Sequence, residues 1–186
     1  WRNSTPWGVV VSEFMLQQTP VNRVLPVWEA WMKKWPTPKH LAKAKKSDVI
    51  KHWGRLGYPR RALRLHETSK IITTKYRGSI PKTLPELREL PGVGEYTAAA
   101  IYSFAYGKRA LVLDTNIRRV FARAIDGKEY ASLTLNNKER TKREKLIPRE
   151  ASLWAAATME LGATICTARS PQCEICPIAQ SCVWRF

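Results

Sequence analysis

The sequence predicts an all-α protein. Apolar side chains recur at spacings of three and four residues in several segments, as they do on the buried face of a helix. We find no strong alternation of apolar and polar residues between hairpin turns, the pattern of a half-buried strand. With 44% hydrophobic residues, among them 8 Trp, 6 Tyr and 4 Phe, the 186-residue chain can bury a core. This composition excludes disorder as its main state.

The N-terminal segments begin with helix-start signals. The first helix is expected over residues 7–18, because hydroxyl side chains precede Pro6, which suits the first helical turn. Pro20 opens the next helix, whose apolar stripe is expected to pack in the core. The stripe consists of Val24, Val27, Trp28 and Trp31.

Further helices are expected over residues 38–44, 47–53 and 59–76. Ser47 is expected to cap the second of these, and Gly78 stops the third. Residues 138–145 are almost entirely charged, which indicates a solvated helix face or loop, with contacts to phosphate as the alternative. No repeat with a period of about 20–50 residues is present, which excludes solenoids.

The net charge points to a polyanionic partner. Lys and Arg number 32 against 15 Asp and Glu, which leaves +17 and favours nucleic acid. The longest apolar runs are far shorter than the roughly 20 residues that cross a bilayer. We therefore expect no membrane partner.

The four cysteines lie close together near the C-terminal end of the sequence. Cys166, Cys173, Cys176 and Cys182 follow the spacing C-x6-C-x2-C-x5-C. Structural zinc sites usually separate two C-x2-C pairs by a longer excursion, and one such pair is present here. A compact loop of thiolates suits an iron-sulfur cluster, with zinc or free thiols as the alternatives.

This loop resembles the 4Fe-4S cluster loop of the endonuclease III and MutY branch of DNA glycosylases. The resemblance implies a structural 4Fe-4S cluster held by the four cysteines of residues 166–182. It also implies that the loop places a basic residue on the DNA backbone, and Arg169 is the candidate.

A glycine-rich turn over residues 90–94 has the sequence Leu-Pro-Gly-Val-Gly and precedes a small-residue helix over residues 97–105. Two glycines allow a sharp turn, and the free N–H groups of a helix N-terminus bind phosphate. The segment resembles the helix-hairpin-helix of DNA repair proteins, in which a sodium or potassium ion often binds backbone carbonyls. The resemblance makes Leu90, Gly92, Val93 and Gly94 DNA-binding candidates.

Asp114 stands where the resemblance places the catalytic aspartate of these glycosylases. Its carboxylate would stabilise or trap the sugar cation as the base leaves, although the residue could also simply cap the following helix. Tyr96 and Asn116 are expected to assist Asp114. Bifunctional relatives carry a lysine at the position of Tyr96, so we expect hydrolysis without an efficient strand-cleaving step.

Residues 11–19, Val-Ser-Glu-Phe-Met-Leu-Gln-Gln-Thr, closely resemble the MutY adenine glycosylase segment. In that segment the glutamate, here Glu13, protonates N7 of the purine. Apolar neighbours on the helix are expected to desolvate Glu13 and raise its pKa. The alternative is a surface residue at a helix turn.

The same resemblance supplies contacts to DNA and to the base. Gln18 is the expected wedge beside the extruded base and Gln17 a supporting contact. Arg61 lies at the basic start of a helix and is a DNA-binding candidate. Trp1 and Arg2 are candidates for the adenine pocket.

The sequence thus predicts a two-lobed, all-α helix-hairpin-helix DNA glycosylase fold with a 4Fe-4S cluster loop. Residues 1–106 would form a lobe of the six-helix-barrel type with the hairpin, and residues 107–186 a helical lobe with the cluster loop. The active cleft is expected between Glu13 and Asp114.

The predicted function is that of a monofunctional glycosylase that removes adenine opposite 8-oxoguanine or guanine from double-stranded DNA. We expect a monomer in a reducing, intracellular compartment, the bacterial nucleoid or a nucleus. A thymine or uracil mismatch glycosylase of the same fold is one alternative, because Asp-Thr-Asn, found here at residues 114–116, also occurs in thymine-mismatch relatives. A non-catalytic iron-sulfur DNA-binding module and a zinc-bound nucleic-acid adaptor are the others.

Overall fold

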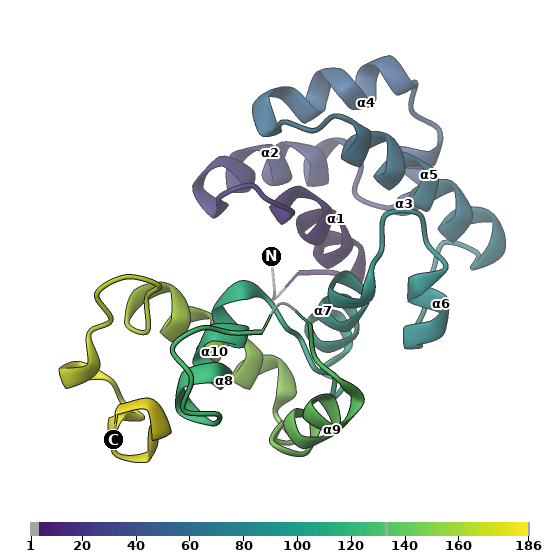
Figure 1. The fold of residues 1–186 in the computed structure, drawn as a ribbon. Helices are drawn as coiled ribbons and strands as arrows, with labels where there is room; N and C mark the ends of the chain where they lie inside the picture. Colours follow the sequence, from purple (N-terminus) through teal and green to yellow (C-terminus); the bar gives the residue numbers. More distant parts are fainter. Residues whose placement is uncertain (1–3, 133, 186) are drawn as a thin grey trace. The chain divides into compact units, whose positions relative to one another are not determined.

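The chain folds into two compact units, residues 1–106 and residues 107–186 (Figure 1). The computed structural model describes residues 4–132 and 134–185. Over these residues every regular element is helical, which confirms the predicted all-α class. In the same ranges no helix combines the length and the apolar character that crossing a membrane requires.

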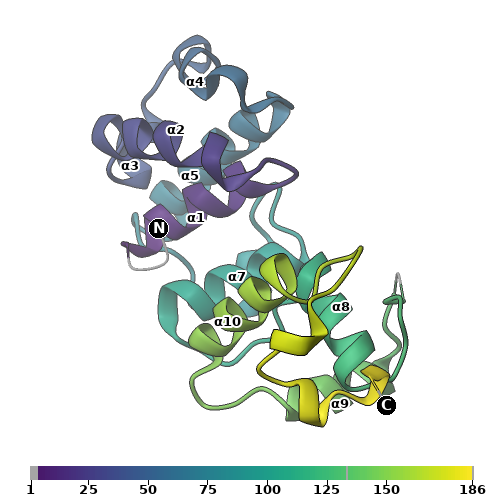
Figure 2. The same cartoon turned by 90° about the vertical axis from the view of Figure 1, so that its left-hand side faces the viewer.

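The first unit is a helical assembly built around α1, which is buried from Trp7 to Met15. α1 packs against α2, α5 and α7, and α5 packs in turn against α3 and α4 (Figures 1 and 2). The elements are α1 (Pro6–Leu16), α2 (Val21–Lys34), α3 (Pro38–Ala42), α4 (Lys46–Trp53), η1 (Gly54–Leu56), α5 (Arg60–Lys75), α6 (Leu84–Arg88) and α7 (Glu95–Tyr106).

Tryptophans anchor the core of this unit. Val24 and Trp31 of the predicted stripe are fully buried, and Val27 and Trp28 pack partly buried against the same cluster. The Trp31 indole N–H donates to a backbone carbonyl at 2.8 Å, so its polar atom is satisfied inside the core. The prediction that this stripe packs in the core is confirmed.

Helix boundaries follow the predicted signals with small shifts. Thr5 caps α1, and its hydroxyl accepts from the Gly8 N–H at 3.2 Å. The prediction that Ser47 caps α4 is wrong. The Lys45 carbonyl accepts from the Asp48 N–H at 3.0 Å and from the Val49 N–H at 3.1 Å, which makes Lys45 the N-cap and places Ser47 inside the first turn.

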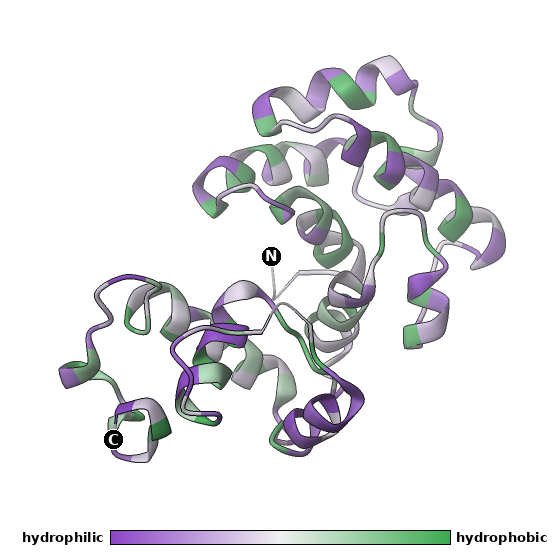
Figure 3. Ribbon diagram, viewed as in Figure 1, coloured by the Kyte–Doolittle hydropathy of each residue, from purple (hydrophilic) through white to green (hydrophobic). Residues whose placement is uncertain are grey.

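In the second unit α8 packs against α10, and a loop with three short 3-10 turns carries the cysteines. The elements are α8 (Thr115–Ala124), α9 (Asn137–Lys145), α10 (Ala151–Thr164), η2 (Cys173–Ile175), η3 (Ala179–Ser181) and η4 (Val183–Arg185). Figure 3 shows the contrast between the apolar α1 and the charged α9. The charged run is a largely solvated helix, except that Arg143 is buried and pairs with Asp126 at 2.6 Å.

Candidate functional site

Glu13 is a buried carboxyl in the middle of helix α1. It is 4% exposed, and Val10 and Phe14 beside it are exposed by 0% and 1%. Its position follows from the helix, in which every residue from Trp7 to Met15 is buried. The carboxyl is therefore shielded from bulk water by the apolar residues of its own helix.

The turn that follows α1 carries the two predicted wedge residues. Gln17 is half-buried, and its amide Nε2 donates to the carbonyl of Gly92 in the hairpin at 3.3 Å. Gln18 is exposed, and its backbone has a φ of +56°, in the left-handed region that residues other than glycine rarely adopt. The two amides are therefore different: Gln17 ties α1 to the hairpin, and Gln18 points to solvent.

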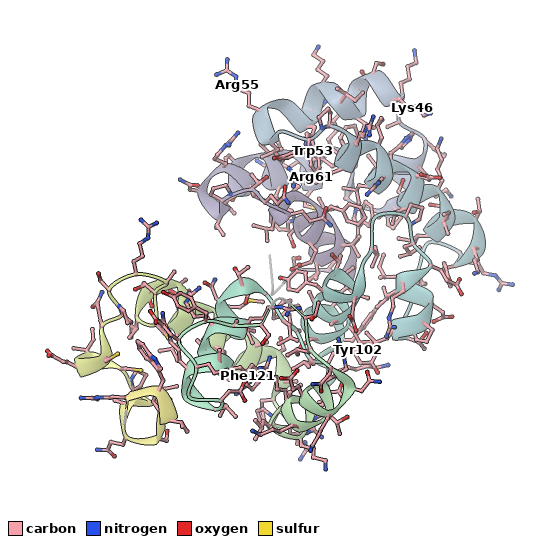
Figure 4. The ribbon with its side chains drawn as sticks, in the orientation of Figure 1. Lys46, Trp53, Arg55, Arg61, Tyr102 and Phe121 are labelled. Carbon is pink, nitrogen blue, oxygen red and sulfur yellow. The ribbon has the colours of Figure 1, made fainter. Side chains whose placement is uncertain are left out.

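Arg61 lies inside the protein instead of on its surface. It is 8% exposed, and Figure 4 places it beside Trp53, whose ring centroid is 5.3 Å from the guanidinium carbon. Burial lowers the pKa of this guanidinium from its usual value. Its acceptors are the carbonyls of Phe14, Met15, Gln17, Leu56 and Gly57 and the hydroxyl of Thr19. The prediction that Arg61 contacts DNA does not fit this position, because its donors are directed at the protein.

The hairpin at residues 90–94 combines buried side chains with an accessible backbone. Leu90 and Val93 are exposed by 2% and 6%, so their side chains belong to the core. Gly94 is exposed, and its carbonyl accepts from the Ala98 N–H at 2.9 Å as α7 begins. Any contact that this segment makes to phosphate would therefore come from its backbone N–H groups, as at other helix N-termini.

The two hairpin glycines are not equivalent, which gives a matched pair of variants. Gly92 has a φ of +81°, and a methyl group there would lie 2.9 Å from the Phe14 ring and 3.1 Å from the Arg64 side chain. Gly94 has open space around the same position. We expect Gly92→Ala to lower the free energy of unfolding by about 2 kcal/mol through backbone strain and overpacking.

Urea denaturation of both variants measures this difference. Gly94→Ala should shift the unfolding midpoint much less than Gly92→Ala does. Equal shifts for the two substitutions would contradict the packing described for the hairpin.

Asp114 caps helix α8 and is held at both of its oxygens. Oδ1 accepts from the Ile117 N–H at 2.6 Å, and Oδ2 accepts from the Asn116 amide at 3.3 Å. The capping role weighed from the sequence is therefore present, and it fixes the carboxylate in one orientation.

A short chain of contacts connects this cap to the cysteine loop. Arg119 donates from Nη2 to the Asn116 side-chain oxygen at 2.8 Å and from Nε to the Cys166 carbonyl at 2.7 Å. It also donates to the carbonyl of Gly162. A methyl group on Gly162 would lie 2.7 Å from Asn116 Cβ, so glycine allows α10 to approach the start of α8.

The four cysteines line one cavity. Cys166, Cys173, Cys176 and Cys182 are all on its wall. In the part of the chain that the structure describes, no three His, Cys, Asp or Glu side chains converge on a point that could hold a single metal ion. Four cysteine ligands around one cavity suit an iron-sulfur cluster, whose irons bind one cysteine each.

Arg123 is a buried cation beside this cavity, 2% exposed. Its Nη1 donates to the Cys166 sulfur at 3.6 Å and to the Thr167 carbonyl at 2.7 Å. The guanidinium carbon also lies 4.6 Å from the centroid of the Trp184 ring. These contacts hold a positive charge next to a sulfur that would be a thiolate when it binds iron.

The remaining predicted residues are placed as follows. Tyr96 is half-buried in the first turn of α7. Arg169 is exposed in the cysteine loop, where the Thr167 hydroxyl donates to its carbonyl at 2.7 Å. Trp1 and Arg2, predicted for a base pocket, lie outside the described residues. Glu13 and Tyr96 belong to the first unit, and Asp114 and Asn116 belong to the second.

The sequence did not predict three residues that connect α8 to α10 and the cysteine loop. They are Arg119, Arg123 and Gly162. One signal was available, because the two arginines lie four residues apart on one face of the helix that Asp114 begins. The acceptors that tie both arginines to the cysteine loop lie between residues 162 and 168, more than 40 residues away, and no periodicity reveals such a pairing.

Comparisons with known proteins agree with this geometry. Residues 11–147 match the family described as HhH-GPD superfamily base excision DNA repair protein. Residues 166–182 match the iron-sulfur binding domain of endonuclease III. The cysteine loop is therefore an iron-sulfur binding domain, and its four cysteines are consistent with a 4Fe-4S cluster.

Similar proteins include an adenine DNA glycosylase of Mycobacterium tuberculosis, 47% identical over 189 residues. The alignment covers 100% of this chain and 62% of that relative, so the chain spans less than two thirds of its length. A thermostable thymine-DNA glycosylase has a similar structure, with a TM-score of 0.88 and 30% identity over 100% of this chain and 87% of that one. A non-covalent endonuclease III–DNA complex gives a TM-score of 0.84 and 25% identity, covering 98% and 85%.

Proposed function

The chain belongs to the HhH-GPD superfamily of base excision DNA repair proteins, and from that premise we propose that it is a monofunctional DNA glycosylase that removes adenine mispaired with 8-oxoguanine or guanine. The observation that carries the proposal is the buried carboxyl of Glu13, 4% exposed on an apolar helix. Adenine is a poor leaving group until its ring is protonated, and a buried acid is suited to that task. The similarity to an adenine DNA glycosylase supports the same substrate.

In the proposed reaction Glu13 gives its proton to N7 of the extruded adenine. The bond between C1′ and N9 then breaks, and its electron pair leaves with the neutral base. The sugar is left with positive charge at C1′. Water adds there and loses a proton, which yields free adenine and an abasic site.

Asp114 would stabilise the positive sugar. Its carboxylate is fixed by the Ile117 N–H at 2.6 Å and the Asn116 amide at 3.3 Å, so it needs little reorganisation as charge develops. A second carboxylate has this role in glycosidases generally. Asn116 keeps the carboxylate oriented.

The absence of an amine at residue 96 limits the reaction to hydrolysis. A tyrosine cannot form the Schiff base through which a lysine would lead to strand cleavage. We therefore propose that the abasic site is the final product and that the strand stays intact until alkali is added.

Contacts to DNA are proposed to come from the hairpin backbone, the exposed Gln18 and the exposed Arg169. The net charge of +17 supports a double-stranded DNA partner, with binding that weakens steeply as salt rises. The sodium or potassium ion at the hairpin, the monomeric state and an intracellular location stay predictions.

The cluster loop is proposed to order the start of α8. A 4Fe-4S cluster bound by the four cysteines would supply a rigid centre for residues 166–182. Arg119 contacts both the Cys166 carbonyl and the Asn116 side chain, so the loop supports the residues around Asp114. The cluster takes no step in the proposed hydrolysis.

Arg123→Met should loosen the cluster. The variant loses a buried positive charge and the N–H donor 3.6 Å from the Cys166 sulfur. Since such outer contacts are worth about tenfold or more in metal affinity, we expect visible absorbance to disappear about tenfold faster under chelator. Lys128→Met, which removes an exposed charge of the same unit, is the control and should lose absorbance at the wild-type rate. Equal rates for Arg123→Met and wild type would contradict the assignment.

A panel of duplexes tests the function. The protein is incubated with duplexes that contain A:8-oxoguanine, A:G, T:G and U:G pairs, and each reaction is then treated with alkali. We expect breaks at adenine in the first two duplexes, and no breaks in any duplex without alkali. Breaks at thymine or uracil alone would contradict the adenine assignment.

A thymine or uracil mismatch glycosylase is the second candidate. The observation in its favour is the likeness to a thymine-DNA glycosylase at 30% identity and a TM-score of 0.88. The sequence Asp-Thr-Asn at residues 114–116 points the same way. The T:G and U:G duplexes of the same panel decide between the two candidates.

A further inference from the structure

We propose that Arg61 is a positioning residue for base extrusion. Its buried guanidinium fixes the turn that carries Gln18, so that this exposed amide enters the base stack as part of a rigid element. The inference rests on the proposed function, because the wedge role of Gln18 belongs to that function. It assigns to Arg61 an action through Gln18 and no direct contact with DNA.

One side of the guanidinium closes the end of helix α1. Nη1 donates to the carbonyls of Phe14 and Met15 at 3.2 and 3.1 Å, and also to the Gln17 carbonyl. The last carbonyls of a helix have no partner inside the helix, and a cation there is favoured by the helix dipole. Arg61 therefore determines where α1 stops and where the wedge turn begins.

The other side of the guanidinium joins this turn to a second one. Nη2 donates to the Thr19 hydroxyl at 2.9 Å and to the Leu56 carbonyl at 3.1 Å. The Thr19 hydroxyl itself donates to the Leu56 carbonyl at 3.2 Å, which closes a triangle of contacts. The turn after α1 is thus fixed to the turn that ends η1, about 40 residues further along the chain.

The wedge residue needs this support because of its backbone. Gln18 has a φ of +56°, a conformation that residues other than glycine hold only when the surroundings impose it. Arg61 binds the residue on each side, at the Gln17 carbonyl and the Thr19 hydroxyl. Gln17 adds a link to the hairpin through the Gly92 carbonyl at 3.3 Å. Gln18 is therefore presented at a fixed place relative to the segment proposed to hold the DNA backbone.

The buried guanidinium is not fully satisfied by its protein partners. Arg61 Nε is buried without a hydrogen-bond partner among the described residues, which is unfavourable for folding. A side chain that must separate stacked bases benefits from a rigid support. A mobile amide would move aside and leave the bases stacked. The geometry therefore assigns Arg61 a role in extrusion through the rigidity of the turn.

Extrusion is measured with 2-aminopurine at the target adenine, opposite 8-oxoguanine. The fluorescence of this purine rises when it leaves the stack, and it is recorded before any base is released. Arg61→Lys keeps the charge but loses the planar fork that serves several carbonyls. Arg60→Lys is the matched control, because it makes the same change at the exposed neighbouring position. We expect Arg61→Lys to reduce the extrusion equilibrium about tenfold and Arg60→Lys to leave it unchanged.

A double-mutant cycle with Gln18→Ala shows whether Arg61 acts through the wedge. In the Gln18→Ala background, Arg61→Lys should have almost no further effect on extrusion. Thr19→Val removes one contact of the guanidinium at little change in shape, and it should lower extrusion by about threefold. This second variant decides the matter if Arg61→Lys does not fold.

The outcomes separate the inference from the function on which it rests. Wild-type extrusion in both Arg61→Lys and Thr19→Val would overturn the inference and leave the glycosylase proposal standing. A loss of the same size with and without Gln18 would overturn it too, since Arg61 would then act elsewhere. No extrusion of the purine by the wild-type protein would contradict the proposed function, and the inference would fall with it.

Discussion

Asp114→Asn should abolish most of the adenine excision while leaving the fold intact. Asparagine caps helices as well as aspartate does, so its side-chain oxygen can keep the bond to the Ile117 N–H and the start of α8. What the variant loses is the negative charge that would face the sugar cation. We expect single-turnover excision from an A:8-oxoguanine duplex to fall by about 10³-fold. The rate of alkali-revealed breaks at adenine measures this loss.

Two controls make the result specific. Urea denaturation of Asp114→Asn should stay close to wild type, with a difference of at most about 1 kcal/mol from the lost interaction with the helix dipole. Duplex binding should also persist. Full activity in this variant would contradict the catalytic role, and it would support the non-catalytic DNA-binding alternative.

Glu13→Gln should have an effect of comparable size through a different step. The substitution keeps the shape of a side chain that is 4% exposed, and it removes the proton that the mechanism delivers to adenine. General acid catalysis contributes about 10²–10⁴-fold, so we expect excision of adenine to fall within that range. The measurement is again single-turnover excision, with duplex binding followed in parallel.

The comparison variant for Glu13→Gln is Ser12→Ala, at an equally buried neighbour on the same helix. The Ser12 hydroxyl donates to the Val9 carbonyl at 2.8 Å, inside its own helix, so its removal should leave excision within about threefold of wild type. An equal loss of excision activity in both variants would indicate that the cause is damage to helix α1. The missing proton of Glu13 would then not explain the effect.

The all-α class and most helix positions followed from local signals. Thr5 before Pro6 marks the start of α1, and Asp114 marks the start of α8, because capping depends on residues adjacent in sequence. Ser47 shows the limit of such signals. Ser47, a capping residue type two positions after the observed N-cap Lys45, lies inside the helix, because the backbone bonds to the Lys45 carbonyl start α4 earlier.

The candidate site was predictable where a residue type and its neighbours in sequence define the chemistry. Glu13 within an apolar helix and the spacing of the four cysteines are examples. The role of Arg61 was not predictable in this way. A basic residue at a helix start is usually solvated, and this one is buried because carbonyls from residues 14–17 and 56–57 surround it.

The contacts of Arg119 and Arg123 could not be predicted from the sequence either, because their acceptors in the cysteine loop are distant in sequence. Both side chains are directed at carbonyls of residues 162–168, which only the packing of α8 on α10 brings near. Gly162 permits this approach, yet one glycine in an otherwise helical segment has no distinctive pattern.

A duplex with 7-deazaadenine opposite 8-oxoguanine tests the central claim most directly. This base keeps the shape and pairing edge of adenine but has a carbon in place of N7, so it cannot accept the proton from Glu13. We predict that the wild-type protein binds this duplex as tightly as the adenine duplex and releases no base from it. Release of 7-deazaadenine at the rate found for adenine would show that the reaction needs no proton at N7 and would contradict the role given to Glu13.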